Sequence, residues 1–377
     1  MIPLTPTALA EAAANVYDGT LGEGLADLRR MPSTVIDEGP QRTVRHYHPV
    51  ASEAVTRPPS EAVAPRRRAP VLLVPPLAAP AICFDLRRGC SVVEHLVQGG
   101  RPTYLVDYGE IEYADRGLGL EHWIEDVVPN AIRAASADAG GRPVRLVGWC
   151  LGGILSLLAL AADPALPVAS AALVASPFDF SKVPLVAPLR PVAAITQGWG
   201  VTQLYRLLGG APAPLVRRGY QAAGFDKYLM KPWTVLSNLH DRELLAQIEA
   251  VDAFMARMHA YPGRTFGQLY HRFFRTNDLA DGKLAVRDGT IDLGVLELPV
   301  LAIAGRGDGI APVAACHHVE ALLARARVEL ATAPGGHLGV LTGRAAAGTT
   351  WTLLDGFLDQ APARRRARRS KSRAGAA

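Results

Sequence analysis

The sequence has no apolar run long enough to cross a membrane. A spanning helix needs about 20 consecutive apolar residues, and every apolar run in these 377 residues is shorter. The first residues, Met-Ile-Pro-Leu-Thr, also lack the charged and apolar segments of a secretory signal. We therefore expect a soluble, cytoplasmic protein.

Cysteine is scarce as well. The chain has four, at Cys83, Cys90, Cys150 and Cys316. Four are too few for a disulfide scaffold in a chain of this length, and their spacing matches no metal-binding motif. Cys316 and the two histidines after it resemble a ligand cluster in composition only, because adjacent side chains on a helix point in different directions. We predict no metal and no bound cofactor.

What the chain does contain is an alternation of strand and helix patterns. Apolar runs typical of buried strands occupy 70–74, 103–107, 144–147, 168–175 and 298–305, with a further strand at 327–331. Helical patterns lie between them, at about 120–137 and 313–325, and a last helix is expected at about 346–358. The alternation predicts a mostly parallel sheet with helices on both faces.

The segments outside this alternation predict the domain organisation. We expect an N-terminal helix within 1–30, and a hairpin that pairs 34–37 with 43–47. The predicted units are 1–69 (helix, hairpin and a connector with Pro and Arg), 70–176 with 295–360 (core), 177–294 (inserted helical cap) and 361–377 (basic disordered tail).

The cap segment is rich in aromatic residues. Most of these are expected to be ordinary packing residues, and a minority to line a channel for an acyl group. They are Trp199, Tyr205, Tyr220, Tyr228, Trp233, Phe254, Tyr261, Phe266, Tyr270, Phe273 and Phe274.

Cys150 is the leading catalytic candidate. It lies in Gly-Trp-Cys-Leu-Gly-Gly at 148–153, after a strand pattern and before a helix pattern, which is the context of a nucleophile elbow. Gly148 and Gly152 give the strained turn the space to close. The alternative is a small buried cysteine that happens to lie between glycines.

Asp308 and His337 follow Cys150 in the order that the α/β-hydrolase fold imposes on nucleophile, acid and histidine. Asp308 comes directly after the strand pattern at 298–305, and His337 lies in a glycine-flanked loop after the next strand. Functional groups of open α/β sheets gather at that edge. Taken singly, Asp308 can be a turn residue and His337 a loop histidine.

An oxyanion formed at Cys150 needs two backbone N–H donors. The residue after the nucleophile, Leu151, is expected to supply one. The loop after 70–74 is expected to supply the other, and Leu77 is its first eligible donor because Pro75 and Pro76 have no N–H.

Several short motifs together resemble the polyhydroxyalkanoate synthases, cysteine members of the α/β-hydrolase superfamily. They occur in that family's order, cover about 70–360, and are most specific from Phe274 to Pro312. The motifs are Val-Pro-Pro at 74–76, Asp-Leu at 85–86, the cysteine elbow, Phe-Asp-Phe at 178–180, Thr-Asn-Asp-Leu at 276–279, Gly-Lys-Leu at 282–284, Ile-Asp-Leu at 291–293, Asp-Gly-Ile-Ala-Pro at 308–312 and Gly-His at 336–337.

The resemblance implies an enzyme that takes hydroxyacyl groups from coenzyme A thioesters through an acyl-Cys150 intermediate to an alcohol, with His337 as base and Asp308 as its partner. The chain departs from the family in three places: Leu-Ala-Ala-Pro-Ala-Ile at 77–82 has no Trp, Gly309 replaces the usual histidine, and 233–238 lacks the Trp-Asn-x-Asp pattern. In length the chain is similar to the short synthases that work with a second subunit.

Two other functions stay open. The same triad serves a hydrolase, namely a thioesterase, a lipase-like esterase or a polyester depolymerase. Dienelactone hydrolases share the elbow but are compact enzymes without so large an insertion. A third possibility is a non-catalytic scaffold on lipid or polymer inclusions. The complete triad argues against this function.

The tail at 364–373 holds seven cations and no anion, and without it the formal net charge of +5 becomes about −2. A solvated disordered tail is the first expectation. The alternative is contact with an anionic membrane or inclusion surface. A nucleic-acid partner is not expected. The sequence leaves open both a second subunit and a homodimer.

Overall fold

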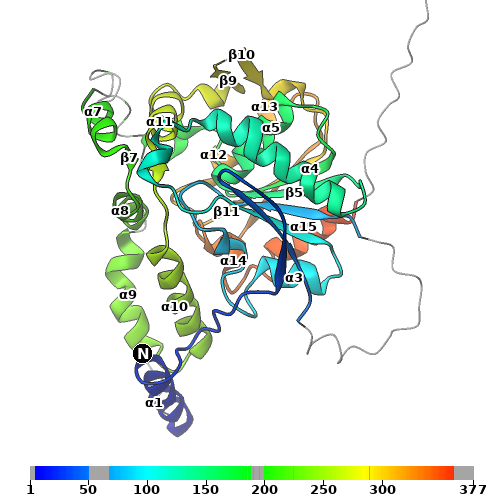
Figure 1. Ribbon diagram of the computed structural model, residues 1–377. Helices are drawn as coiled ribbons and strands as arrows, with labels where there is room; N and C mark the ends of the chain where they lie inside the picture. Colours follow the sequence, from blue (N-terminus) through cyan, green and yellow to red (C-terminus); the bar gives the residue numbers. More distant parts are fainter. Residues whose placement is uncertain are drawn as a thin grey trace, which may run out of the picture.

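We analysed a computed structural model of the chain (Figure 1), which describes residues 5–50, 68–184, 186–187, 190, 195, 199–223, 225–287 and 289–360. The basic tail and most of the Pro- and Arg-containing connector lie outside the described residues. Within the described part, no helix has both the length and the apolar character needed to span a bilayer.

An eight-stranded sheet forms the centre of the molecule. Its spatial order is β1-β2-β4-β3-β5-β6-β11-β12, and all pairs from β4 to β12 are parallel, whereas β2 runs antiparallel to its neighbours. The strands are β1 (Ser33–Gly39), β2 (Arg42–Tyr47), β3 (Val71–Val74), β4 (Thr103–Asp107), β5 (Val144–Trp149), β6 (Val168–Val174), β11 (Val300–Gly305) and β12 (Val328–Ala333). This is the α/β-hydrolase fold, so the predicted fold class is confirmed.

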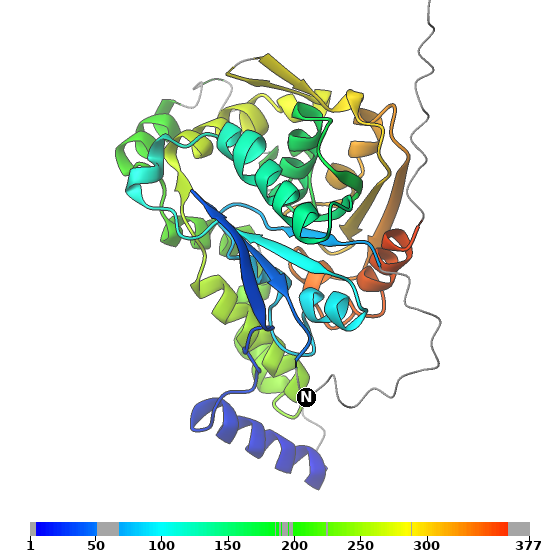
Figure 2. The same cartoon turned by 45° about the vertical axis from the view of Figure 1, so that its right-hand side comes forward.

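Helices cover both faces of the sheet. Figure 2 shows α3 (Val92–Gln98) and α15 (Thr350–Leu358) on one face, and α4 (Val128–Asp138) and α5 (Leu151–Ala162) on the other. His95 of α3 joins α15 through a hydrogen bond of 2.8 Å between Nε2 and Asp355 Oδ2. Because both faces are covered, β3, β5 and β11 are buried along their whole length, as their continuous apolar runs predict.

The segment 177–294 is mainly helical but contains two small antiparallel ribbons as well. One pairs β7 (Gly210–Ala211) with β8 (Tyr261–Pro262), and the other pairs β9 (Lys283–Val286) with β10 (Gly289–Asp292). Its helices are α7 (Trp199–Leu208), α8 (Ala213–Ala223), α9 (Phe225–Ser237), α10 (Arg242–Ala256) and α11 (Gly263–Gln268), which continues as the π-helical η6 (Leu269–Arg275). Short 3-10 turns are η4 (Phe180–Lys182), η7 (Asp278–Asp281) and η8 (Leu293–Val295).

One hydrogen-bonded junction fixes where this segment leaves and rejoins the core. Asn277, in a left-handed conformation with φ 63°, donates from Nδ2 to Asp179 Oδ1 at 2.9 Å and accepts from the Phe180 N–H at 2.8 Å. Hydrogen bonds from Ser181 and Asn277 outweigh burial and lower the pKa of Asp179. Two motifs that resemble the synthases, at 178–180 and 276–279, thus contact each other and have a structural role.

The N-terminal helix packs on the cap segment rather than on the sheet (Figure 1). α1 (Pro6–Thr20) begins at Thr5, whose hydroxyl accepts from the Ala8 N–H at 3.2 Å. Asn15 donates to the Leu239 carbonyl at 2.8 Å, and Asp18 pairs with Arg242 at 2.6 Å.

Three predicted helices differ in detail. The helix expected at 313–325 is two short ones, α12 (Val313–Cys316) and α13 (Val319–Leu322), because the rings of His317 and His318 bond to main-chain carbonyls of other segments. The helix expected at 120–137 opens as a π-helix, η3 (His122–Val127), before α4. Pro129 lacks an N–H and therefore interrupts the ladder of the first turns. The last helix is α15, which begins at Thr350 rather than near 346.

Candidate active site

Cys150 lies at the sharp turn between β5 and α5. Its backbone has φ 52° and ψ −123°, a conformation that a non-glycine residue adopts at a cost of about 1–3 kcal/mol. A Cβ on Gly148 would come within 2.5 Å of the Gly153 Cα, and one on Gly152 within 2.1 Å of the Val74 carbonyl oxygen. The two glycines are therefore required for this turn, as the sequence predicts.

The other three cysteines are placed as inert core residues. Burial raises the pKa of Cys83, Cys90 and Cys316. The thiols of Cys90 and Cys316 donate to main-chain carbonyls at 2.8 Å and 3.3 Å. Cys150 differs from them because its side chain lines a cavity.

Asp308 and His337 meet at the carboxyl edge of the sheet. Asp308 Oδ2 accepts from His337 Nδ1 at 2.8 Å, and its side chain is fully buried. Asp308 Oδ1 accepts from the N–H groups of Ile310 at 2.8 Å and Ala311 at 2.9 Å. These bonds hold the carboxylate in one orientation, so the imidazole is fixed with Nε2 as its free nitrogen.

The electrostatics of His337 link it to Cys150. Burial alone lowers the pKa of this histidine, but the charges of Cys150 and Asp308 and hydrogen bonding to both raise it to about 10. Its Nε2 is buried and has no hydrogen-bond partner of good geometry among the described residues. This nitrogen is therefore free to interact with the Cys150 thiol. Trp149 packs against the imidazole with ring centroids 5.1 Å apart and donates from Nε1 to the His337 carbonyl at 3.1 Å.

The structure brings Cys150, His337 and Asp308 together. The two expected oxyanion donors, Leu151 and Leu77, lie in different surroundings. Leu151 is the first residue of α5, where the N–H has no acceptor within the helix. Leu77 is buried in the loop after β3 and lines a small separate hollow with Tyr108, Trp123 and His259. No described contact joins Leu77 to Cys150, and its role stays a prediction.

Cys150 opens into an apolar cavity of about 460 Å³ between the core and the cap. Leu151 and Ile154 of α5 and Ile310 of the acid-bearing loop form its floor, and α7, α8 and α11 supply walls. Five of the eleven cap aromatics named from the sequence line it: Tyr205, Tyr220, Tyr261, Phe266 and Phe274. The side chain of Tyr228 is outside the described part.

Tyr220 and Tyr261 are functional candidates that sequence reasoning did not single out. The Tyr220 hydroxyl donates to that of Tyr261. Burial raises the pKa of both, and the charge of Cys150 adds to the effect, so both rings lie close to the thiol. Their only signal in the sequence is membership of the aromatic-rich segment.

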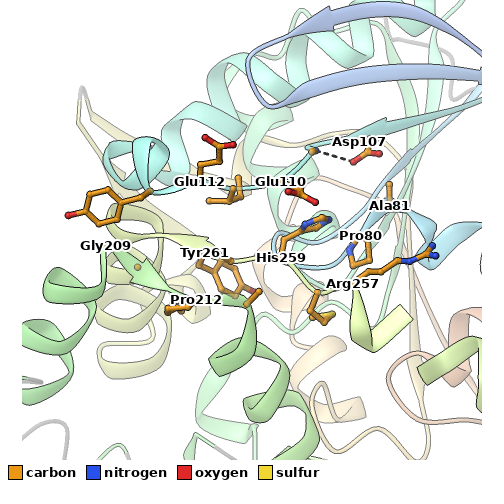
Figure 3. Close-up of a pocket in the computed structure, with 18 of the residues that line it drawn as sticks. Pro80, Ala81, Asp107, Glu110, Glu112, Gly209, Pro212, Arg257, His259 and Tyr261 are labelled. Carbon is orange, nitrogen blue, oxygen red and sulfur yellow. Dashed lines mark hydrogen bonds between the residues drawn. The ribbon is translucent and has the colours of Figure 1, made fainter. Parts of the chain in front are cut away.

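A second hollow, a groove of about 770 Å³, lies on the other side of the β7–β8 ribbon and shares Tyr261 and Ala211 with the apolar cavity. Figure 3 shows its charged residues, which come from the last residue of β4 and the loop after it and from the chain before β8. They are Asp107, Glu110, Glu112, Arg257 and His259. We call it the acidic groove, because three carboxylates line it beside one guanidinium and one histidine whose pKa is lowered by burial.

Comparison with known proteins finds distant homologues over most of the chain. The chain is 24% identical over 327 residues to the poly(3-hydroxyalkanoate) polymerase subunit PhaC of Allochromatium vinosum, covering 86% of this chain and 89% of that protein. It is 23% identical over 292 residues to the PhaC subunit of Haloferax mediterranei, covering 76% of this chain. The match spans 57% of that protein's length. No protein-family model matches the chain.

Solved structures with a similar fold include a Rhodococcus esterase, at 16% identity and a TM-score of 0.46 over 88% of this chain and 98% of the esterase. Another is the mouse alpha/beta hydrolase domain-containing protein 10, at 15% identity and a TM-score of 0.48 over 87% and 98% of the two chains. The fold assignment rests on the strand order of this chain itself.

Proposed function

We propose that this chain is a polyhydroxyalkanoate synthase-like cysteine acyltransferase. It takes acyl or hydroxyacyl groups from coenzyme A thioesters and passes them to an alcohol. The observation that carries the proposal is a strained cysteine at an elbow, coupled to a buried His–Asp pair and open to an apolar cavity of about 460 Å³.

The first half-reaction forms the acyl-enzyme. The Cys150 thiol gives its proton to His337 Nε2, the thiolate attacks the thioester carbonyl, and the developing oxyanion is stabilised by the Leu151 N–H at the start of α5. The intermediate then expels the coenzyme A thiolate, which takes its proton from His337. A histidine whose pKa is raised to about 10 is protonated at neutral pH, which suits this acid role.

The second half-reaction releases the acyl group. His337, now neutral, takes the proton of an acceptor hydroxyl, whose oxygen attacks the acyl-Cys150 carbonyl. The ester forms, the sulfur leaves as thiolate, and the imidazolium is restored. Exchange of one thioester for another is nearly balanced in energy, so the acyl group stays activated until the acceptor arrives.

The apolar cavity and the homology both support this substrate class. An acyl chain buries its methylene groups at about 0.8 kcal/mol each, and the lining residues offer almost no hydrogen-bonding groups except the tyrosines. The polymerase subunits to which the chain is distantly homologous are described by name as acting on 3-hydroxyalkanoates.

Incubation with a panel of acyl and 3-hydroxyacyl coenzyme A thioesters tests the proposal. Thiol release measures turnover, and mass spectrometry identifies a covalent acyl group on the Cys150 peptide and the final product. We expect an acyl-enzyme and an ester product. Absence of any acyl-enzyme from every thioester would refute the acyltransferase.

A hydrolase with the same triad is the second candidate. The observation that favours it is the acidic groove, which reaches Tyr261 beside Cys150 and offers a polar route for water. In the same assay, free acid in place of ester would identify a thioesterase, and turnover of esters alone would identify an esterase or depolymerase.

A further inference from the structure

We propose that a pocket of arginines beside the apolar cavity binds the phosphate groups of coenzyme A. The pocket has a volume of about 460 Å³ and is lined by Arg116, Arg206, Arg264, Arg272 and His271. We call it the arginine pocket. The inference rests on the proposed function, because it says where the anionic end of the thioester lies.

The arginine pocket carries positive charge that the described residues do not neutralise. Arg264 pairs with Glu121 at 3.0 Å and Arg272 with Asp278 at 3.5 Å, but Arg116 and Arg206 form no ion pair within the described part of the chain. Arg116 instead lies over the Tyr113 ring, with Cζ 4.6 Å from the centroid.

Among the residues that the structure describes, no carboxylate lines the arginine pocket. The positive charge acts on His271, which lines the same pocket. Burial is the main cause that lowers the pKa of His271, and the charges of Arg275 and Arg206 lower it further. Its Nε2 is bonded to the Thr202 hydroxyl at 2.9 Å. An anion entering the arginine pocket therefore meets Arg116 and Arg206, which form no ion pair within the described part; Arg116 Nη1 donates one hydrogen bond, to the Tyr113 carbonyl at 3.1 Å. Guanidiniums suit phosphate oxygens because each can donate two parallel hydrogen bonds.

The arginine pocket adjoins the apolar cavity at Tyr205, whose side chain lines both. The Tyr205 ring lies against Gly267, where an added Cβ would come 2.6 Å from the tyrosine oxygen. The same two elements form walls of both hollows. α7 contributes Leu204 to the apolar cavity and Arg206 to the arginine pocket, and η6 contributes Leu269 to the apolar cavity and Arg272 to the arginine pocket.

This arrangement matches a molecule with an apolar acyl end and a phosphorylated nucleotide end. The acidic groove on the other side of the β7–β8 ribbon has the opposite sign, since Asp107, Glu110 and Glu112 would repel phosphates. Charge therefore selects the arginine pocket for coenzyme A and leaves the acidic groove to uncharged molecules such as water or an alcohol acceptor.

Adenosine 3′,5′-bisphosphate is the probe for this site, because it carries phosphates of coenzyme A but no thioester. We would measure its binding to the full chain by calorimetry, for the parent and for the double variant Arg116→Gln, Arg206→Gln. Loss of two charged hydrogen-bonding partners should weaken binding about tenfold or more. Arg217→Gln, on the exposed face of α8, is the matched control and should bind as the parent does.

Kinetics give the second measurement. For an acyl coenzyme A the double variant should raise KM about tenfold with kcat little changed, whereas for the acyl N-acetylcysteamine thioester, which has no phosphate, both constants should stay as in the parent. A KM that rises equally for both thioesters would mean that the arginines support the cap rather than bind phosphate, and would overturn the proposal. Equal thermal unfolding midpoints establish that the variants fold.

The binding arm separates this inference from the proposed function. If no thioester is turned over but the bisphosphate binds in an arginine-dependent way, the function fails and the phosphate site stands. If inorganic phosphate binds as tightly as the bisphosphate, the arginine pocket is an adventitious ion site only. If the chain binds phosphatidylglycerol vesicles through these arginines and does not bind the bisphosphate, the ligand is a lipid headgroup. Either of these last two results overturns the assignment to coenzyme A.

Discussion

The sheet core and the cap differ in how they use apolar side chains. Every residue of β5 is buried, and so are most residues of α5 behind Cys150. The cap helices, in contrast, leave large apolar side chains in solvent: Trp199 is 70% exposed, Leu207 80% and Trp233 66%. The core therefore holds Cys150, Asp308 and His337 in fixed positions, whereas α7 and α9 of the cap leave several large apolar side chains exposed.

This difference assigns the chemistry and the choice of substrate to separate regions. Cys150, Asp308 and His337 all follow the carboxyl ends of core strands. The cavity walls, the acidic groove and the arginine pocket take residues from the cap. Substitutions in the core should abolish reaction or folding, and those in the cap should change which substrate reacts.

The largest effect is expected at Cys150. Cys150→Ala removes the sulfur that would carry the acyl group, so thiol release and covalent labelling by an acyl thioester should disappear while the fold is kept. Mass spectrometry of the labelled peptide checks this, with Cys90→Ala as the control that should still be labelled. Label found on Cys83, Cys90 or Cys316 in the Cys150→Ala protein would disprove the assignment.

Substitutions of His337 and Asp308 should lower turnover by different amounts. His337→Ala should lose nearly all turnover, because proton transfer is lost, whereas Asp308→Asn should lose less because the imidazole remains. Steady-state thiol release measures both. Turnover in Asp308→Asn equal to the parent would remove Asp308 from the triad.

Stability should separate core from cap. Leu155→Ala in α5, where the side chain is fully buried, should lower the free energy of unfolding by about 2–5 kcal/mol. Trp233→Ala in α9 should change it by less than about 0.5 kcal/mol, because the side chain is mostly exposed. Urea unfolding followed by circular dichroism gives both values. Similar decreases in the free energy of unfolding in the two variants would contradict the difference between core and cap.

A cap substitution should change the acyl chain that is accepted. Val216 of α8 is buried against the apolar cavity, so Val216→Phe should reduce kcat/KM for long acyl thioesters about tenfold and leave short ones nearly unchanged. Arg217→Gln on the same helix is the control. Equal reduction for short and long chains would place the acyl group elsewhere.

The smallest effect is a shift in a titration. Because the Cys150 charge helps to raise the pKa of His337 to about 10, Cys150→Ala should lower that pKa, which NMR of the ring protons would record. A folded-state pKa above the ordinary 6.5 means that the protonated ring stabilises the parent fully below about pH 6.5, and that this contribution is lost as pH rises through about 10. If the pKa of His337 is the same in Cys150→Ala as in the parent, the Cys150 side chain does not influence this histidine.

Features that rest on local chemistry and on chain order could be predicted from the sequence. The glycines around Cys150 are required by contacts of 2.5 Å and 2.1 Å, and such a turn is recognisable because it needs small residues between a strand and a helix. Asp308 and His337 were identifiable because parallel strands bring the loops at their carboxyl ends to one edge. The mostly parallel sheet that makes this edge is confirmed.

The distant residues that surround that edge could not be predicted in this way, because their positions depend on how the chain packs in three dimensions. Three features depend on segments that have no periodic relation to each other in the chain. They are the contact of Tyr220 with Tyr261, the break in the helix at His317 and His318, and the presence of Arg116 and Arg206 in one pocket. Periodicity reports which face of an element is buried, but not which partner buries it. Cap residues line the cavity at Cys150 because contacts far apart in sequence, such as that of Asn277 with Asp179, place the cap segment there.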